Sequence, residues 1–396
     1  MKIAAVKLTP VAVKRRTGFL SRHVIVELTT DDGQVGLGEM SDLGHLPLYM
    51  PDVRDLQKNL NRLLAGRDPM QLNALEQLLL EMFPEEMFMY DMSAVIRCGV
   101  DVALHDLVGR ELGVPVSQLV GGAVRDKLRV CYPIFRHRSK SEVDHNVAIV
   151  GERLTEGFDL IRLYAGLDLD ADELFLEGIR EKYGRKVKVK SLDFSNLVPW
   201  RRAVEATRRL ARFDVELIES PAPRNDLDGM VEVRRRVDLP VSEHCYSFHQ
   251  ARLMLEKGCV DIFNVCTVFI GGIGPARRLF ALAETFGVHG LIGTTQELSI
   301  GTAAQAHLGA SIARLDHPGD PVGPRLYADD VVAKRVDYVQ GHLVVPQGPG
   351  LGVELDPAKL AQLTAPLEWG AESLPSIQDR TVPHEPPPRR RKSKER

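Results

Sequence analysis

Three acidic residues stand at the ends of three successive short apolar runs. Asp193 ends the run VKVKSLD, Glu219 ends VELIE and Glu243 ends LPVSE, with separations of 26 and 24 residues. If these runs are neighbouring parallel strands, their carboxyl ends lie at one edge of the sheet and the three side chains converge. Converging carboxylates repel one another unless a cation neutralises them. The spacing therefore predicts a metal site, and hard oxygen ligands suit Mg²⁺, with Mn²⁺ as the second choice.

The alternative interpretation of each of these residues is structural. One acidic side chain at a strand end is more often a helix cap or an ion-pair partner than a metal ligand. The recurrence of the same position on three consecutive runs favours the metal.

The elements that would position this site alternate between strand and helix from about residue 130. Helical stretches such as DADELFLEGIREKY separate the apolar runs, which recur at intervals of roughly 22–30 residues and favour a closed barrel of parallel strands over an open sheet. No run is followed by GxGxxG, which disfavours a dinucleotide-binding fold. The strand candidates are residues 130–135, 158–166, 186–195, 214–220, 239–245, 259–269 and 289–295.

The first part of the chain has a different pattern. HVIVELTTDDGQVGLGE alternates on both sides of Asp32-Gly33, which indicates a hairpin, and helical patterns follow. The last helix, 93–112, begins at a possible cap, Ser93, and ends before Gly113. We predict an α/β fold, a modified TIM barrel of (β/α)7β type with an N-terminal α+β capping domain. The predicted parts are the cap at 1–125, the barrel at 126–340, a segment returning to the cap at 341–372 and a disordered basic tail at 373–396.

The composition is typical of a globular enzyme with a small-molecule substrate. The formal net charge is −3 over 396 residues, which provides no basic field for nucleic acid. The last eight residues, RRRKSKER, carry +5 and leave −8 on the rest; a solvated tail is favoured over a nucleic-acid or membrane role. Five cysteines without zinc spacing, and no signal peptide, indicate a cytoplasmic protein with reduced thiols. No apolar run approaches the ~18 residues of a membrane span.

These motifs, in this order, resemble the enolase superfamily, in its mandelate racemase and muconate lactonizing branch. The resemblance covers about residues 1–365 and rests on DGQVGLGE, AVIRCGVDVALHDLVGRELGVPVSQLVGG, LDFSN, LIESP, PVSEH, VDIFNVCTVFIGGI and TTQELSIGTAAQAHLGAS. It implies that Mg²⁺ held by Asp193, Glu219 and Glu243 binds a substrate carboxylate and stabilises the enediolate formed when the α-proton leaves. It also implies that cap loops near 14–21 and 40–50 select the substrate, and that the protein is a homo-oligomer, from a dimer to an octamer.

The acid–base residues depart from this resemblance. The second barrel strand of such proteins often carries Lys-x-Lys, but the matching run here is Arg162-Leu163-Tyr164, so Tyr164 takes the place of the base. The ordinary pKa of tyrosine is ~10, and Arg162 and the metal would favour the phenolate. In the other interpretation, Arg162 pairs with a metal-ligand carboxylate and Tyr164 hydrogen-bonds the substrate. Cys266 stands five residues before Gly271-Gly272, where the resemblance implies a Lys or an Asp; a packed thiol is the safer interpretation.

Two further residues are acid–base candidates. His244 directly follows the third predicted ligand and is its fallback, because Glu243 lies nearer the preceding proline than the resemblance implies. Glu297 matches a Glu that faces the active site, or else it caps the helix beginning near Ser299. The candidates for substrate contact are Asn264, Cys266 and Thr295, and the helical residues His105, Asp106 and His307 are interpreted as structural.

We expect an enzyme that removes the α-proton of a small carboxylate, most specifically a Mg²⁺-dependent lyase that dehydrates a hydroxy acid such as a sugar acid. Dehydration needs one base and one acid, which Arg162, Tyr164, His244 and Glu297 can supply, whereas racemisation needs a base on each face. The alternatives are a racemase, epimerase or cycloisomerase with Cys266 or His244 as the second base, and a metal- and carboxylate-binding protein without turnover. No nucleic-acid or membrane partner is expected.

Overall fold

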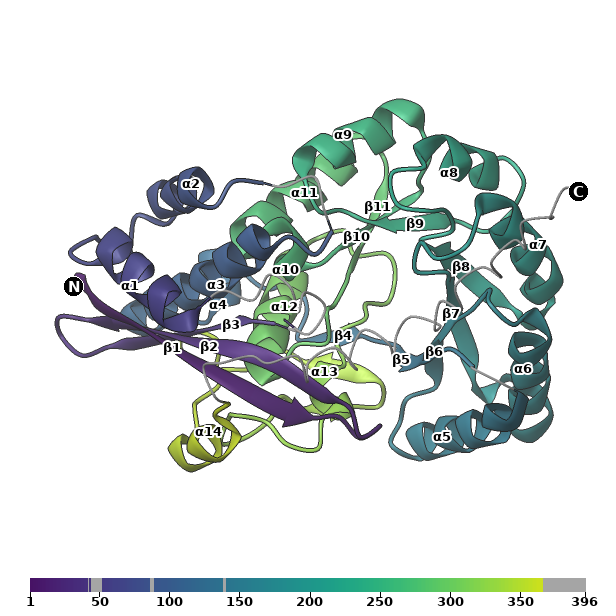
Figure 1. The fold of residues 1–396 in the computed structure, drawn as a ribbon, viewed down its shortest axis with the longest axis horizontal. Coiled ribbons are helices and arrows are strands. Elements are labelled where there is room, and N and C mark those ends of the chain that lie inside the picture. The colour runs from purple at the N-terminus through teal and green to yellow at the C-terminus, as the bar shows by residue number, and fades with distance from the viewer. Residues whose placement is uncertain (42, 44–51, 86–88, 138–139, 366–396) are drawn as a thin grey trace, which may run out of the picture.

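The computed structural model describes residues 1–41, 43, 52–85, 89–137 and 140–365 (Figure 1). An antiparallel cap, at the purple N-terminal end of the figure, lies beside a larger strand–helix barrel. Most of the cap loop 40–50 and the whole predicted tail 373–396 lie outside the described residues.

The cap consists of a three-stranded antiparallel sheet and three helices. A turn at Asp32-Gly33 joins the second and third strands of this sheet, as the alternation predicted. Gly33 has a φ of +88°, which a residue without a Cβ adopts readily. The elements are β1 (Ile3–Lys14), β2 (Leu20–Thr30), β3 (Val35–Met40), α1 (Val53–Leu64), α2 (Leu72–Met82) and α3 (Met92–Leu112).

Helix α3 is buried on nearly every side. Its N-terminus is capped by Asp91, whose carboxylate accepts hydrogen bonds from the N–H groups of Ser93 and Ala94, so the prediction of Ser93 as the cap was wrong by two residues. Gly113 ends the helix with a left-handed φ of 68°, as predicted. A helix that is buried all round belongs between two packed layers, which here are the cap sheet and the barrel.

Seven parallel strands follow in sequence order, each paired with the next. This arrangement confirms the predicted barrel fold. The predicted strand 259–269 was too long, because the last of these residues form a short helix, α10 (Thr267–Ile270). The strands are β5 (Tyr132–Ile134), β6 (Leu160–Tyr164), β7 (Lys188–Asp193), β8 (Val215–Glu219), β9 (Val241–His244), β10 (Ile262–Val265) and β11 (His289–Ile292).

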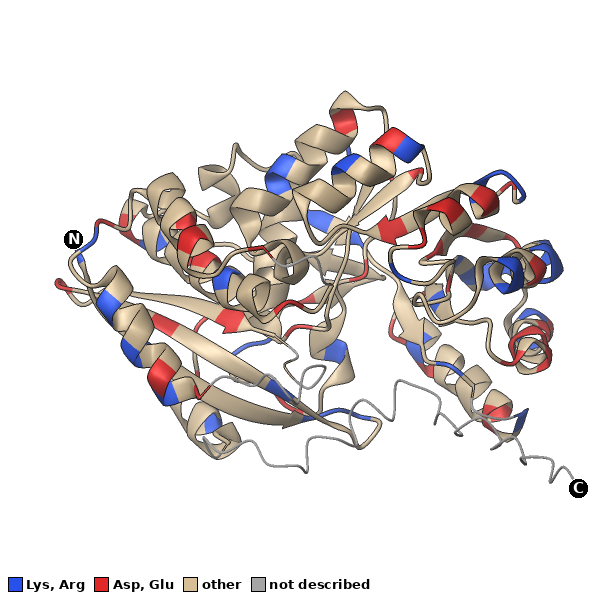
Figure 2. Ribbon diagram, turned by 45° about the horizontal axis from the view of Figure 1, so that its top comes forward, with Lys and Arg blue, Asp and Glu red and all other residues tan. Residues whose placement is uncertain are grey.

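Helices cover the outside of the barrel (Figure 1), and basic and acidic residues are interspersed along them (Figure 2). None of the described helices is both long and apolar enough to cross a membrane. The covering helices are α5 (Val143–Thr155), α6 (Leu169–Tyr183), α7 (Trp200–Leu210), α8 (Leu227–Arg234), α9 (Phe248–Lys257), α11 (Ile273–Thr285) and α12 (Ser299–Ser311). The remaining elements are α4 (Val116–Leu119), α13 (Gly323–Leu326), α14 (Pro357–Leu363), a small sheet of β4 (Lys127–Arg129), β12 (Tyr338–Val339) and β13 (His342–Val344), and the 3-10 turns Lys140–Glu142, Gly184–Lys186 and Ala211–Phe213.

A short extended segment at Gly319-Asp320 closes the ring between β11 and β5. Gly319 forms a parallel bridge with Val130, and the N–H of Asp320 donates to the carbonyl of Ile292 at 2.9 Å. The segment therefore takes the place of an eighth strand. The Asp320 side chain is buried, with 1% of its residue surface exposed.

Buried carboxylates fasten the cap to the rest of the chain. Asp106 of α3 accepts hydrogen bonds from the N–H of Leu37 in β3 at 2.8 Å and of Leu351 at 2.7 Å, which is a structural role. Glu39 of β3 accepts from the N–H of Leu298 at the start of α12 at 2.8 Å, where a negative charge is favoured by the helix dipole. The C-terminal segment also runs back to the cap, because residues 364 and 365 pair with β1.

The imidazole of His307 should make stability depend on pH. His307 lies fully buried in α12; it accepts from the N–H of Ser117 in α4 at 3.3 Å and reaches the carbonyl of Leu351 at 3.1 Å. Burial lowers its pKa to about 4. Because the pKa is lower in the folded protein, the neutral imidazole contributes its full stabilisation above pH ~6.5. This contribution to the free energy of unfolding, about 3 kcal/mol, is lost as the pH falls towards 4.

His307→Gln should therefore be less stable than the unaltered protein near neutral pH but lose less stability between pH 6.5 and 4, as measured by urea unfolding. His145→Gln, at an exposed position of α5, is the control and should keep the original pH dependence. An unchanged slope in His307→Gln would show that this imidazole is not responsible.

Candidate active site

Two buried carboxylates lie side by side at the carboxyl ends of β7 and β8. Asp193 and Glu219 are register partners, so their side chains face the same side of the sheet. Burial and the adjacent charge of Glu219 raise the pKa of Asp193 to about 6. Burial acts in the same direction on Glu219, but the charge of Arg162 and a hydrogen bond from His244 lower its pKa to about 2. The pair therefore places concentrated negative charge inside the barrel.

Arg162 and Tyr164 of β6 lie next to this pair. Arg162 Nη2 donates to the Tyr164 hydroxyl at 2.8 Å, and Arg162 Nη1 lies 3.4 Å from Glu219 Oε1. Phe135 stacks on the phenol ring with centroids 5.5 Å apart, and the Arg136 guanidinium lies 5.2 Å from the ring centroid. The phenol is thus held in one orientation with its oxygen beside a cation.

A further group of charges lies in the barrel interior. Lys190 of β7 is fully buried, and its Nζ donates to Asp320 Oδ1 at 2.6 Å. Asp320 Oδ2 lies 3.5 Å from Arg162 Nη1, and Asp320 Oδ1 accepts from Cys131 Sγ at 3.0 Å. Asp320 therefore compensates two buried cations and fixes Arg162 between itself and Glu219.

His244 of β9 and Asn264 of β10 face the same carboxylate. His244 Nε2 lies 3.3 Å from Glu219 Oε1, and Asn264 Nδ2 donates to this oxygen at 3.1 Å. Asn264 fits because residue 293 is glycine; a Cβ there would lie 2.0 Å from Asn264 Oδ1. Burial acts to lower the pKa of His244, but the hydrogen bond to Glu219 and the nearby carboxylate charges raise it overall.

Glu243, which was expected as the third metal ligand, points elsewhere. Its Oε1 accepts from Ser220 Oγ and from the N–H of His244, both at 2.8 Å, and its Oε2 accepts from Asn196 Nδ2 at 2.8 Å. Adjacent residues of a strand face opposite sides, and the one that faces Glu219 is His244. The structure therefore places the fallback residue at the position predicted for Glu243.

A cavity of about 70 Å³ opens over these side chains, and Tyr164 and Asp193 line it. Four other lining residues have left-handed backbones despite having side chains: Ser195, Asn196, Ser220 and Gln296, with φ of 50°, 57°, 51° and 71°. Such conformations each cost on the order of 1–3 kcal/mol and cluster at functional sites. A larger hollow of about 250 Å³ lies among α2, α3 and α11, but it contains none of the barrel carboxylates.

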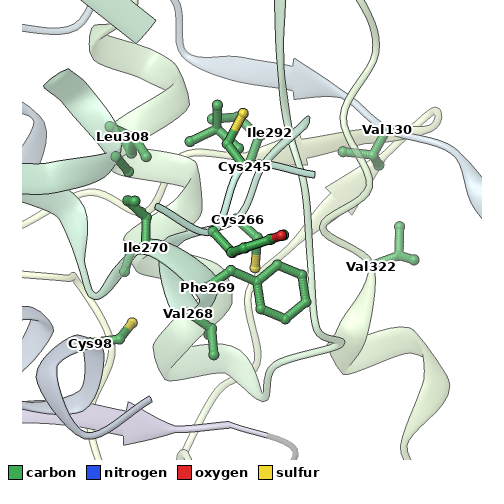
Figure 3. Packing of buried hydrophobic residues seen from close by; sticks show 14 of the residues in the cluster. Cys98, Val130, Cys245, Cys266, Val268, Phe269, Ile270, Ile292, Leu308 and Val322 are labelled. Atoms are coloured by element: carbon green, nitrogen blue, oxygen red, sulfur yellow. The ribbon is translucent and has the colours of Figure 1, made fainter. Parts of the chain in front are cut away.

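Glu297 and Cys266 lie behind the cavity wall. Glu297 accepts from the N–H and hydroxyl of Thr295, at 2.9 and 2.8 Å, and Cys266 Sγ donates to it at 3.7 Å. Cys266 packs beside Phe269 (Figure 3), and burial and the charge of Glu297 raise the pKa of its thiol well above the usual range. Thr295 lines the cavity, so Glu297 orients a wall residue. Glu297 does not cap α12; the carboxylate of Glu39 accepts from the N–H groups of Leu298 and Gly301 at the start of that helix.

The cap reaches this cavity from the other side. Tyr90 lines it, Ser41 Oγ lies 3.0 Å from Thr295 Oγ1, and the Arg15 side chain donates to the side chain of Gln296. Arg15 belongs to the loop 14–21, which was expected to contact the substrate.

Asp193, Glu219 and His244 are the residues that would hold a divalent cation at these strand ends. As the side chains stand, no three His, Cys, Asp or Glu residues within the described ranges make a group that could hold a metal ion. The donors nevertheless fit an ion, because Glu219 Oε2 is buried without a hydrogen-bond partner in the described part of the chain.

The sequence interpretation missed Lys190, Asp320 and Arg136. Lys190 belongs to the alternating run KVKVK, which indicates a strand with a polar face but not that this face is buried. Asp320 lies in DHPGDPVG, which has no periodicity, and it is 130 positions away from the lysine that it pairs with. No local pattern signals such a pair.

A barrel of parallel strands with an α+β cap reaching a cavity at the strand ends defines the class of capped barrel enzymes. The chain belongs to the enolase superfamily, in its mandelate racemase and muconate lactonizing branch: residues 147–359 match the enolase C-terminal domain-like family, and residues 1–121 match the mandelate racemase/muconate lactonizing enzyme N-terminal domain.

Several relatives of the chain are isomerases. It is 28% identical to chloromuconate cycloisomerase of Pseudomonas putida, over 92% of this chain and 99% of the relative. It is 29% identical to L-Ala-D/L-Glu epimerase of Bacillus subtilis, over 88% of this chain and 94% of the relative. A solved structure of muconate lactonizing enzyme superposes with a TM-score of 0.84 at 25% identity, over 92% of this chain and all of that one.

Removing the Asp320 charge should strongly destabilise the barrel. Asp320→Asn leaves the buried Lys190 and Arg162 without their shared carboxylate, and breaking a buried ion pair costs about 3–5 kcal/mol. Chemical denaturation measures the loss. Asp337→Asn, which removes an exposed carboxylate 2.5 Å from Lys334, is the control and should cost under about 1 kcal/mol. Equal losses in the two variants would contradict the role of Asp320.

Proposed function

We propose that this protein is a metal-dependent isomerase of the cycloisomerase type, which moves one proton between Tyr164 and the carbon α to a substrate carboxylate. The single observation that carries the proposal is the one-sided placement of acid–base groups around the cavity. A divalent cation, when bound, supplies the positive charge that stabilises an enediolate.

Tyr164 is the acid–base group. Tyr164 lines the cavity, and Arg162 donates to its hydroxyl oxygen at 2.8 Å. A donor to this oxygen stabilises the phenolate, which accepts the α-proton in the ring-opening direction. In the ring-closing direction the phenol delivers a proton to the α-carbon, and solvent then restores the phenol. Phe135 and Arg136 hold the ring plane, so the proton moves along one direction.

The strand opposite β6 provides no second base. The amide of Asn264 has no proton to exchange as an acid or base. Burial and the charge of Glu297 raise the pKa of the Cys266 thiol, which donates a hydrogen bond to Glu297. A racemase needs a base on each face of the substrate, whereas a cycloisomerisation adds or removes its proton on one face only. The placement of acid–base groups therefore supports a cycloisomerisation.

The isomerase relatives support this reaction class over the dehydration expected from the sequence. Dehydration of a hydroxy acid shares the first step, loss of the α-proton, but it also needs an acid for the departing hydroxide. His244 is that acid only if it is not a metal ligand. Dehydration is therefore the second candidate, and the two reactions give different products.

The test is a panel of unsaturated dicarboxylates, N-acyl amino acids, dipeptides and sugar acids, incubated with the protein and Mg²⁺ or Mn²⁺ in D2O and followed by NMR. The proposal requires a product of the same composition with one deuterium at the α-carbon. A 2-keto acid formed by loss of water would establish dehydration instead, and exchange on both faces would reject a one-base site.

Tyr164→Phe removes the proton carrier while keeping the ring. We expect turnover of the active substrate to fall by ~10²-fold or more, because general acid–base groups contribute about that much. Tyr183→Phe, which removes a hydroxyl bonded to the Val147 carbonyl between α5 and α6, is the matched control and should lose less than about fivefold. A similarly small loss for Tyr164→Phe would reduce the phenol to a binding role.

A further inference from the structure

We infer that the hollow among α2, α3 and α11, which we call the interface cavity, is a second ligand site that binds a small carboxylate with an apolar body. Arg97 of α3 is the residue that anchors the carboxylate. The inference does not depend on the proposed function, because the interface cavity and the catalytic cavity share no lining residue within the described ranges.

Arg97 is a buried cation that lines the interface cavity without a carboxylate partner. The residue is 4% exposed, and the only hydrogen bond of its guanidinium within the described residues runs from Nη1 to the Phe83 carbonyl at the end of α2. Burial lowers the pKa of Arg97, although the charges of Asp91 and Glu85 act in the opposite direction from beyond ion-pair distance. A desolvated charge without a close counter-ion is costly, and a bound anion would offset that cost.

The two other nitrogens of this guanidinium are positioned to receive a carboxylate. A Cβ at Gly271 would lie 2.8 Å from Arg97 Nε and 3.3 Å from Nη2, so glycine at this position lets the guanidinium lie against the turn after α10. Neither Nε nor Nη2 has a partner in the described part of the chain, and neither is closed off from solvent. Two neighbouring N–H groups of an arginine match the two oxygens of a carboxylate.

The carboxylates that line the interface cavity do not compete for this cation. Glu76 accepts from Arg278 Nη1 at 2.8 Å, and Asp101 accepts from the N–H of Ile273 at 2.6 Å at the start of α11. Glu85, the third, is exposed to solvent. The guanidinium of α3 is therefore the charged group of this wall that still lacks a close partner of opposite charge.

The rest of the wall is apolar and sets the shape of the ligand. The interface cavity has a volume of about 250 Å³. A cavity of ~150 Å³ is large enough for benzene, so a ring or a short branched chain fits here together with a carboxylate. The apolar lining residues are Leu79, Leu80, Phe248, Ile270 and Pro275.

A ligand in this position would contact both parts of the molecule. Leu79 and Arg97 belong to the cap, whereas Phe248 and Ile270 belong to helices of the barrel. Ile270 is also the neighbour in α10 of Phe269, which lines the catalytic cavity. A bound carboxylate would therefore hold the cap against the barrel beside an element of the catalytic site.

The experiment uses phenylacetate as the probe, titrated calorimetrically into the full-length protein. A chelator is present, so that no divalent cation holds the probe in the catalytic cavity. We expect saturable binding of one molecule per chain and an unfolding temperature that rises with the phenylacetate concentration. The neutral phenylacetamide and the cationic 2-phenylethylamine should each bind at least about tenfold more weakly, because neither supplies two anionic oxygens.

Two variants test the anchor and the cavity separately. Arg97→Gln should weaken phenylacetate binding at least about tenfold. Leu80→Trp keeps the guanidinium but fills the cavity, and it should abolish binding even if Arg97→Gln fails to fold. Arg277→Gln is the matched control, because Arg277 is an exposed arginine of α11 outside the cavity lining, and its affinity should change less than about twofold.

The absence of saturable phenylacetate binding would overturn the inference. Equal affinity in the unaltered protein and in Leu80→Trp would show that the probe binds elsewhere. Binding of phenylacetamide or 2-phenylethylamine as tight as that of phenylacetate, or full affinity in a folded Arg97→Gln, would reject the carboxylate anchor.

Discussion

The structure depends on how the barrel tolerates two adjacent buried carboxylates. Asp193 and Glu219 end neighbouring strands in register, where the low dielectric makes their repulsion costly. Arg162 lies between Glu219 and Asp320, and Lys190 neutralises Asp320 from the other side. Three acidic and two basic groups leave one negative charge in excess before His244 is counted. This near balance of opposite charges explains why so many charged groups can share one interior.

The same arginine couples stability to chemistry. Arg162 compensates the carboxylates and also donates to the Tyr164 hydroxyl, so the interaction that permits burial also orients the phenol. The opposite strand has no equivalent, because Cys266 is a buried thiol that donates to Glu297. In the function that we propose, the chemistry is one-sided because one strand brings a titratable group to the cavity and the facing strand does not.

The cap is connected to the cavity wall through a short series of carboxylate contacts. Glu39 of the cap holds the start of α12, and Glu297, two residues before that helix, holds Thr295 at the wall. Ser41 contacts the same Thr295 directly. Displacement of the cap sheet would therefore shift a residue that lines the cavity, which gives the cap a mechanical connection to the site beyond covering it.

Periodicity and spacing in the sequence were sufficient for the barrel and for the neighbouring positions of Asp193 and Glu219, and the resemblance to the family singled out Tyr164 in the place of a lysine. These features follow from local patterns repeated along the chain. Tertiary structure decided the rest. Glu243 and His244 are adjacent in sequence, but a strand sends adjacent side chains to opposite faces, so a shift of one residue exchanges the carboxylate for the imidazole. Asp320 meets Lys190, and Glu39 meets α12, only because ring closure and cap docking bring distant segments together, and no local pattern encodes those contacts.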